Sequence, residues 1–221
     1  MSTIAIIGAG RGLGAAVARK FGAHGFDVAL ISRTQANVDA LAAELQQAGV
    51  NTRGYAADVR DTDALTAVLD RAVSDLGPID VLDYSPIPQR EFLRPVLATT
   101  RDDLIAAVEF SVLGPVAAVG HVLPGMRERG RGTVLFVNGG SAARPNARVA
   151  GTSVAFAGES AYAQMLHTEL ADAGVHVAQL IIPGAIRTGH PTHDPDVLAD
   201  KLWAIHTERG DFRVYAEDLD K

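Results

Sequence analysis

Short apolar runs alternate along the chain with longer segments in which apolar residues recur every three or four positions. The runs are rich in Val, Ile and Ala, which is typical of strands buried on both faces. They cover residues 3–7, 28–31, 79–82, 133–137 and 175–182, and weaker strand patterns cover residues 52–57 and 212–215. Such alternation predicts an α/β fold with a mostly parallel sheet and helices on both of its faces.

The longer segments predict helices, and their ends carry recognisable caps. The predicted helices include residues 12–23, 35–48, 62–76 and 100–129. Thr62 and Thr100 are predicted N-caps, and Gly114-Pro115 is predicted to bend the fourth helix. The chain contains no internal repeat, low-complexity tract or linker, so residues 1–221 are expected to form a single domain.

The amino-acid composition excludes several kinds of site and partner. The 221 residues include no cysteine, which excludes thiolate metal sites, disulfides and a cysteine nucleophile. The net charge is −6 and the acidic residues are scattered, so a nucleic-acid partner is not expected, although a local basic pocket remains open. A metal site is not expected either, because Pro191 and Pro195 prevent the helical spacing that would bring His193 and Asp194 together as ligands. No apolar run approaches membrane-spanning length, and no charged segment precedes the first strand. We therefore expect a soluble, cytoplasmic protein without a membrane partner.

The first predicted strand is followed at once by a glycine-rich turn and a helix. The turn reads Gly8-Ala9-Gly10-Arg11-Gly12-Leu13-Gly14. Glycines permit a tight turn and a close approach of the backbone, while the helix N-terminus offers free N–H groups to a phosphate. The position between first strand and first helix is the one that dinucleotide binding requires. The alternative is a glycine-rich turn without a ligand.

The end of the second strand indicates which dinucleotide would bind. An NAD site places an acidic residue there, about 20 residues past the glycines. This chain has Ser32, Arg33 and Thr34 instead. Arg33 can pair with a 2′-phosphate, Ser32 and Thr34 can donate to it, and Arg11 can reach it from the glycine turn. The pattern predicts NADP(H), unless both arginines are only solvent-exposed surface residues.

Further motifs occur downstream of these strands. They read Ala57-Asp58-Val59, Leu123-Pro124-Gly125-Met126, Gly132-Thr133-Val134, Glu169-Leu170, Gly174-Val175-His176-Val177 and Pro183-Gly184-Ala185-Ile186-Arg187-Thr188. With the Gly-x-x-x-Gly-x-Gly spacing of Gly8, Gly12 and Gly14, the chain resembles the short-chain dehydrogenase/reductase family over nearly its whole length. The resemblance implies a Rossmann fold, a doubly wound sheet of order 3-2-1-4-5-6-7.

The resemblance also implies where the cofactor would lie. Asp58 and Val59 would flank the adenine, and Tyr84 and Ser85, which replace the family's paired asparagines, would line the cofactor. The loop on the nicotinamide side would contribute Pro183, Gly184, Ile186 and Thr188. The helix carrying Tyr162 and His167 would face solvent or a second subunit in a homodimer or homotetramer, and His176 is expected at the surface.

Four positions that carry the family's proton chemistry hold other residues here. The tyrosine position falls on Thr152, the lysine on Phe156, the serine on Gly139 and the asparagine on Ser111. No lysine occurs between residues 21 and 200, so no choice of register restores the tyrosine–lysine pair. The sequence therefore predicts an atypical branch whose pocket favours an apolar or uncharged substrate.

Three residues are candidates for the remaining chemistry. Ser141 could bind a substrate carbonyl or only make a local turn bond, and Thr152 could orient the substrate. His193 could act as an acid or base, could bind a metal with Asp194, or could belong to an ordinary polar loop. Tyr84 is expected to stack near the adenine or pack in the core, rather than act as an acid.

Two classes of function fit these residues. The first is an NADP(H)-dependent reductase acting on a C=N, activated C=C or C=O bond, because the cofactor supplies the hydride and the protein mainly orients it. The second is a catalytically inactive NADP(H)-binding regulator or partner subunit of an active relative. A non-redox enzyme using the vacated pocket is a third alternative.

Overall fold

The computed structural model describes residues 2–219 and contains one seven-stranded parallel sheet of order β3-β2-β1-β4-β5-β6-β7. The strands are β1 (Ser2–Ile7), β2 (Phe26–Ser32), β3 (Thr52–Ala56), β4 (Ile79–Tyr84), β5 (Gly132–Gly139), β6 (Val175–Ile182) and β7 (Arg213–Tyr215). The order confirms the doubly wound fold expected from the sequence. The strands are added outward from β1 on one side and outward from β4 on the other, so the strand order switches between these two parallel neighbours, where Ile7 pairs with Tyr84. Ligands of such sheets bind at this switch point.

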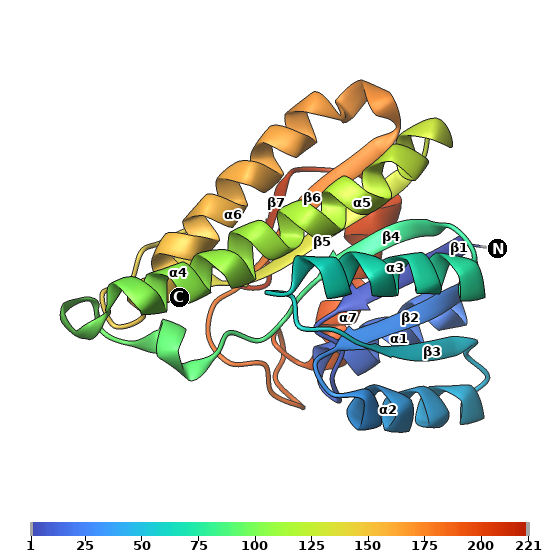
Figure 1. The fold of residues 1–221 in the computed structure, drawn as a ribbon, viewed down its shortest axis with the longest axis horizontal. Coiled ribbons are helices and arrows are strands. Elements are labelled where there is room, and N and C mark those ends of the chain that lie inside the picture. The colour runs from blue at the N-terminus through green and yellow to red at the C-terminus, as the bar shows by residue number, and fades with distance from the viewer. Residues whose placement is uncertain (1, 220–221) are drawn as a thin grey trace.

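Helices cover both faces of the sheet (Figure 1). They are α1 (Leu13–Ala23), α2 (Gln35–Gln47), α3 (Thr62–Leu76), α4 (Arg101–Val108), α5 (Gly114–Glu128), α6 (Ala150–Glu169) and α7 (Pro195–Glu208). Short 3₁₀ turns span Arg90–Leu93, Val96–Ala98, Gly140–Ala142 and Ala171–Ala173.

The core consists of two layers that the sheet separates. Successive strand residues point to opposite faces. Ile6 and Leu30 therefore pack with α1 and α2, whereas Ile7 and Leu82 pack with α3 and α5, and all four are fully buried. Burial on both faces explains why these strands read as continuous apolar runs in the sequence.

The long predicted helix occurs, with an irregularity at its centre. A π-helical segment, Glu109–Leu113, joins α4 to α5 and ends immediately before Gly114-Pro115, where the sequence predicts a bend. The stretch Arg101–Glu128 is long and apolar enough to span a membrane, so the expectation that no run approaches that length is wrong. Half of its most apolar part is buried in the protein, and a helix in a protein core can be equally long and apolar.

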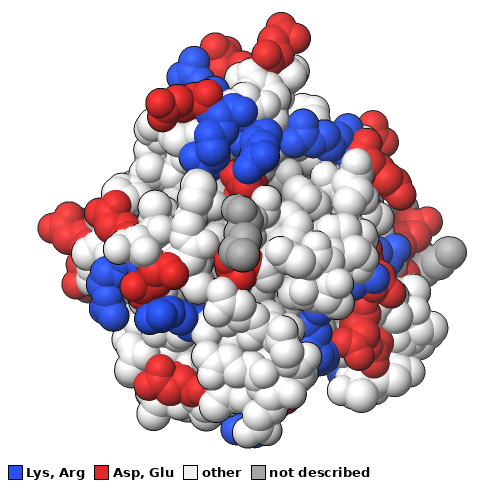
Figure 2. Space-filling view, turned by 90° about the vertical axis from the view of Figure 1, so that its right-hand side faces the viewer, with Lys and Arg blue, Asp and Glu red and all other residues white. Residues whose placement is uncertain are grey.

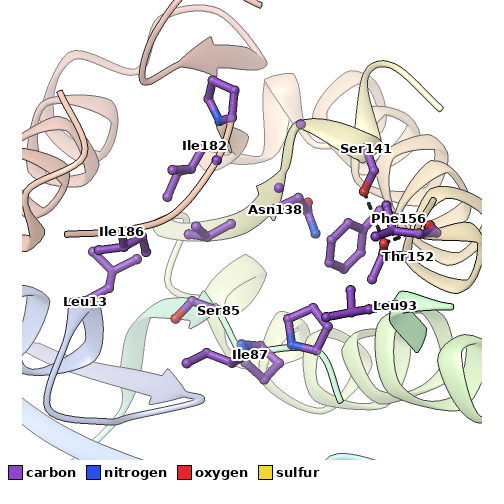
Figure 3. A pocket seen from close by; sticks show the side chains of 18 of the residues that line it. Leu13, Ser85, Ile87, Leu93, Asn138, Ser141, Thr152, Phe156, Ile182 and Ile186 are labelled. Carbon is purple, nitrogen blue, oxygen red and sulfur yellow. Dashed lines mark hydrogen bonds between the residues drawn. The ribbon is translucent and has the colours of Figure 1, made fainter. Parts of the chain in front are cut away.

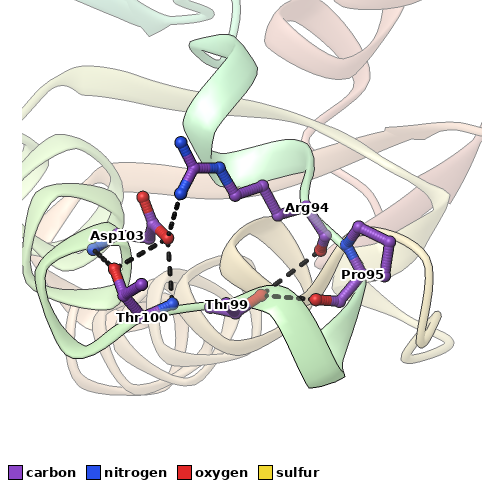
Figure 4. A network of polar contacts seen from close by, with 5 residues as sticks. All are labelled: Arg94, Pro95, Thr99, Thr100 and Asp103. Atoms are coloured by element: carbon purple, nitrogen blue, oxygen red, sulfur yellow. Dashed lines mark hydrogen bonds and ion pairs between the residues drawn. The ribbon is translucent and has the colours of Figure 1, made fainter.

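A capping box starts α4 (Figure 4). Thr100 Oγ1 accepts from the backbone N–H of Asp103 at 3.2 Å, and Asp103 Oδ2 accepts from the backbone N–H of Thr100 at 2.9 Å. Arg94 Nη1 donates to the same Oδ2 at 3.0 Å. These hydrogen bonds lower the pKa of the Asp103 carboxyl. The cap predicted for α3 was one residue late, because Asp61 caps that helix and Thr62 is its first residue.

Figure 2 shows the face of the molecule at which the strands begin, with basic side chains lying against acidic ones. Arg129 and Arg131 both contact the buried carboxylate of Asp80 at 3.1 Å. Arg209 donates to the carbonyl oxygens of Gly174 and Gly132. These arginines therefore stabilise the start of β4, β5 and β6.

Candidate functional site

A cavity of about 1100 Å³ lies at the carboxyl ends of the central strands. It is bounded by the glycine turn after β1, the segment after β4, the end of β5, the start of α6 and the loop after β6 (Figure 3). Its lining includes these predicted cofactor residues: Gly8, Gly10, Arg11, Gly12, Leu13, Gly14, Ser85, Pro183, Gly184, Ile186 and Thr188. The structure thus brings together residues that are far apart in the sequence.

The glycines of the turn serve two different structural purposes, close packing between loops at Gly8 and an open backbone surface at Gly10 and Gly12. Gly8 has φ +96°, and a Cβ there would lie 2.4 Å from Cα of Pro86, so this glycine permits close contact between two loops. By contrast, a Cβ on Gly10 or Gly12 would meet no described atom within 4 Å. These two glycines face the open cavity, and Gly12 caps α1 without a side-chain acceptor. The turn therefore fits a phosphate group that approaches the backbone closely.

The end of β2 lies against the glycine turn. The backbone N–H groups of Gly8 and Ala9 both donate to Ile31 O, at 2.9 and 3.0 Å. Ser32 is the last residue of β2, and Arg33 and Thr34 follow it with exposed side chains. Arg11, also exposed, lines the cavity. The two arginines therefore come from adjacent loops on the same side of the site.

Tyr84 does not line the cavity, so its predicted contact with a cofactor is wrong. Its ring is 2% exposed and its hydroxyl donates to the backbone carbonyl of Phe110, in the π-helical segment. Burial raises the pKa of this phenol well above its usual range. The alternative of plain packing holds, because alternation along β4 directs Tyr84 into the layer with Leu82. Ser85, just past the strand end, faces the cavity instead.

The residues predicted to flank the adenine begin the connection to α3. Val59 is buried in the core, and Asp58 is half-buried, accepting from the backbone N–H of Arg60 at 3.0 Å. They follow β3, two strands away from β1 in the sheet. Neither lines the cavity, and neither do Ser32, Arg33 and Thr34.

Three of the four positions assigned to the family's proton chemistry line the cavity: Gly139, Thr152 and Phe156. A Cβ on Gly139 would lie 3.9 Å from the Phe156 ring, so the ring borders the space that a serine would occupy. Ser111 is buried in the π-helical segment. Ser141 Oγ donates to Thr152 Oγ1 at 3.3 Å, and Thr152 Oγ1 donates to Val149 O at 3.1 Å.

His193 belongs to the loop between β6 and α7, and its side chain does not line the cavity. It is 4% exposed and stacks on His190 with ring centroids 4.6 Å apart. Burial, with a smaller contribution from His190, lowers the pKa of His193. Its Nε2 is 3.6 Å from a carboxylate oxygen of Glu217. Asp194 caps α7, and residues 2–219 contain no cluster of histidines and acids suited to a metal ion.

The outer histidines and Tyr162 are placed differently from the expectation. Tyr162 packs edge-on against Phe136, with ring centroids 6.5 Å apart, and His167 Nδ1 hydrogen-bonds to Val177 O at 2.7 Å. Both side chains contact the sheet and are half-buried, so each of them also keeps an exposed part on the outer side of α6. His176 is only 8% exposed, because β6 is covered on both faces, and burial lowers its pKa to about 4.

Sequence reasoning missed the buried polar residues of the central strands. Asp83 of β4 is fully buried beside Ser85, and Asn138 of β5 lines the cavity at 3% exposure. Glu159 of α6, at 1% exposure, accepts from Asn138 Nδ2 at 3.0 Å. A polar residue inside an otherwise apolar strand run was the available signal for Asp83 and Asn138.

Comparison with known proteins identifies the class that this fold and cavity define. The chain matches the short chain dehydrogenase family over residues 2–196 and belongs to that family. It is similar to the short-chain reductase protein NovJ of Streptomyces niveus, with 32% identity over 91% of this chain and 74% of NovJ. It is also similar to the ketoacyl reductase HetN of a Nostoc species, with 28% identity over 94% of this chain and 71% of HetN.

Solved structures give the same result. A short-chain dehydrogenase from Rhodopseudomonas palustris superposes with a TM-score of 0.86 at 27% identity, covering 98% of each chain. A metagenomic short-chain oxidoreductase in complex with NADP superposes with a TM-score of 0.84 at 25% identity, covering 97% of this chain and 96% of the other. The chain is therefore an oxidoreductase-type protein of the short-chain dehydrogenase family.

Proposed function

We propose that this protein is an NADP(H)-dependent reductase with a non-standard active site. The observation that carries the proposal is the cradle of Gly10 and Gly12, open to the cavity and flanked by Arg11. An NADP complex of a similar structure supports the choice of cofactor. When bound, the dinucleotide supplies the hydride, and the protein binds and orients the reactants.

In this proposal Arg33, Ser32 and Thr34 hold the 2′-phosphate at the end of β2. No acidic residue occupies these three positions, so nothing there repels a second negative charge. The N-terminus of α1 holds the pyrophosphate, and Pro183 to Thr188 cover the nicotinamide side. Asp58 and Val59 remain proposed neighbours of the adenine.

The substrate is proposed to be small and apolar around the reducible bond. The cavity wall opposite the glycine turn carries Leu93 and Phe156, and the apolar side chains of Ile87 and Ile186 also line the cavity. Phe156 places an aromatic ring where the family has a cation. A C=N bond, which can enter already protonated, or an activated C=C or C=O bond fits such walls. Ser141 and Thr152 would orient the substrate.

Calorimetric titration with NADPH and with NADH tests the cofactor. We expect tight NADPH binding and much weaker NADH binding. NADPH oxidation is then followed spectrophotometrically with a panel of cyclic imines, enones and ketones. If NADPH binds but none of the three substrate classes is reduced, the reductase proposal is contradicted. Absence of NADPH binding would contradict the cofactor assignment.

A second candidate is a catalytically inactive NADP(H)-binding partner of an active relative. The observation that favours it is the replacement of all four proton-chemistry positions, at Ser111, Gly139, Thr152 and Phe156. Co-purification from the native host separates the two, since a homodimer or homotetramer without a relative would contradict the pairing. Turnover without consumption of NADPH would indicate a non-redox enzyme. We also propose a cytoplasmic location, which fractionation of the native host tests.

A further inference from the structure

A buried hydrogen-bond chain runs from the edge of the sheet to the cavity. Arg213 of β7 donates from Nε to Gln179 Oε1 at 3.0 Å and from Nη2 to Ser160 Oγ at 2.9 Å. Ser160 Oγ donates to the same Gln179 oxygen at 2.6 Å. Gln179 Nε2 then donates to Asn138 Oδ1 at 2.7 Å, and Asn138 lines the cavity.

This chain fixes the direction of each amide. A guanidinium can only donate, so the Gln179 atom facing Arg213 must be its oxygen. The nitrogen of Gln179 therefore faces Asn138 and must meet an oxygen there. That leaves Asn138 Nδ2 on the other side, where one of its two N–H groups donates to Glu159 Oε2 at 3.0 Å. The orientation of the Asn138 amide is thus set by a residue on β7.

The second N–H group of Asn138 has no partner among the hydrogen bonds of the described chain. Figure 3 shows the Asn138 nitrogen directed toward the Phe156 ring, inside the cavity. Ser141 and Thr152 also line this region, but the Thr152 hydroxyl donates to Val149 O and Ser141 donates to Thr152. The hydroxyl protons of Ser141 and Thr152 therefore already form hydrogen bonds within the protein. The second Nδ2–H of Asn138 can donate to an acceptor atom in the cavity.

Glu159 completes the support of the amide. It is buried, its Oε1 has no hydrogen-bond partner in the described structure, and burial raises its pKa well above the usual range. The same burial disfavours the charged form of Glu159, so this residue holds Asn138 through Oε2 with less negative charge beside the reacting atoms. A carboxylate there would disfavour negative charge developing on the substrate.

We propose that Asn138 binds the acceptor atom of the reducible bond, the oxygen of a carbonyl or the nitrogen of an imine, through its free Nδ2–H. Gln179, Arg213 and Glu159 are positioning residues that act through Asn138. This inference rests on the proposed reductase function. Asn138 neighbours the position Gly139, where the family's serine would stand, so the donor is displaced by one residue.

The chemistry balances without a protein acid. The hydride of NADPH adds to the substrate carbon, and the electron pair of the reducible bond moves to the oxygen or nitrogen. Asn138 stabilises that developing charge by a hydrogen bond and keeps its own proton, while water supplies the proton that completes the product. In a neutral imine the hydride likewise adds to the carbon, and Asn138 donates its hydrogen bond to the nitrogen. An already protonated iminium has no free lone pair and needs no such donor, so Asn138 should matter least for it.

Kinetics test the role through the imine, enone and ketone panel. Asn138→Leu is expected to lower kcat for a ketone by about a hundredfold, as the loss of one such donor does elsewhere. The Kd for NADPH should stay within about twofold. Gln179→Glu keeps the shape of the side chain but cannot donate a hydrogen bond to Asn138 Oδ1. We therefore expect the side-chain amide of Asn138 to flip, and kcat to fall while KM changes little. Gln164→Glu, on the exposed side of α6, adds the same charge as a control. Unchanged kcat in Asn138→Leu would overturn the proposal.

A readout that does not need turnover separates this inference from the reductase proposal. The side-chain NH₂ pair of Asn138 is assigned in the ¹⁵N spectrum of the NADP⁺ complex by its loss in Asn138→Leu. Cyclohexanone, a carbonyl that carries no charge, is then titrated in. We expect one of the two protons to shift downfield and the other, bound to Glu159, to stay. If neither proton shifts at the solubility limit of the ketone, Asn138 is not the donor, even if the wild type reduces substrates.

Discussion

The hydroxyl of Ser85 donates to Oδ2 of Asp83 at 2.8 Å, while Oδ1 of the same carboxyl has no hydrogen-bond partner within the described residues. Asp83 is fully buried between Ile6 of β1 and Leu135 of β5, and Ser85 separates it from the cavity. Burial raises the pKa of Asp83 from 3.8 to about 7, and the bond from Ser85 opposes this rise.

Asp83 should make stability depend on pH. Between pH 3.8 and about 7 the folded protein keeps a proton on Asp83 that the unfolded chain has released. The free energy of unfolding therefore falls as pH rises through this window, by at most about 4 kcal/mol. Asp83→Asn should flatten the dependence. Urea unfolding at closely spaced pH values measures it, with the exposed Asp211→Asn as control. A wild-type profile that stays flat between pH 4 and 7 would contradict the burial argument.

Two glycines of the same turn should respond oppositely to alanine. Gly8→Ala combines a positive φ with a contact of 2.4 Å to Pro86, so we expect a loss of several kcal/mol of stability or failure to fold. Gly10→Ala meets no neighbour within the described chain, so its melting temperature should stay near the wild-type value. Its methyl group enters the cavity, and NADPH affinity should fall at least about tenfold. Calorimetry and thermal unfolding of both variants check this contrast.

Arg33 is expected to decide the preference between the two dinucleotides. A hydrogen bond to a charged group contributes about 1.5–3 kcal/mol, so Arg33→Ala should weaken NADPH binding at least about tenfold. NADH binding should change little, because it carries no 2′-phosphate. Arg127→Ala, exposed near the end of α5, is the matched control. Equal losses for both dinucleotides would show that Arg33 acts on something they share.

The capping box of α4 should contribute to stability without affecting the cofactor. Thr100→Ala removes the side-chain acceptor for the Asp103 N–H and is expected to cost about 1 kcal/mol. Thr100→Ser keeps the acceptor and should restore most of the loss. Chemical denaturation of the two variants measures the difference, and equal stability of Thr100→Ala and wild type would contradict the role of the cap.

Much of the fold followed from the sequence because its signals are local. The apolar runs located all seven strands, and the Thr100 cap located α4. The errors concern features that a local pattern does not determine. Asp61 rather than Thr62 caps α3, because two adjacent residues can both serve as caps and only the backbone angles choose between them. His176 was placed at the surface because a single strand residue does not reveal that both faces of β6 are covered.

The site was predictable where backbone shape matters and less so where side chains meet across the sheet. Glycine spacing located the cradle, and the residues after β6 were found by resemblance. Tyr84 was misplaced because its direction depends on one-residue alternation at the end of β4. The chain through Arg213, Gln179 and Asn138 joins three strands and could not be read from any one segment.

The side chain of Leu219 lines the cavity, only two positions before the last residue of the chain, and its carbonyl accepts from Arg144 Nη1 at 3.2 Å. The first strand begins at the opposite end of the sheet (Figure 1). A protein fused directly after Leu219 would begin at the wall of the cavity, and we expect it to obstruct substrate entry. A protein fused directly before Ser2 would begin at the other end of the sheet, so binding and turnover assays should use fusions on that side.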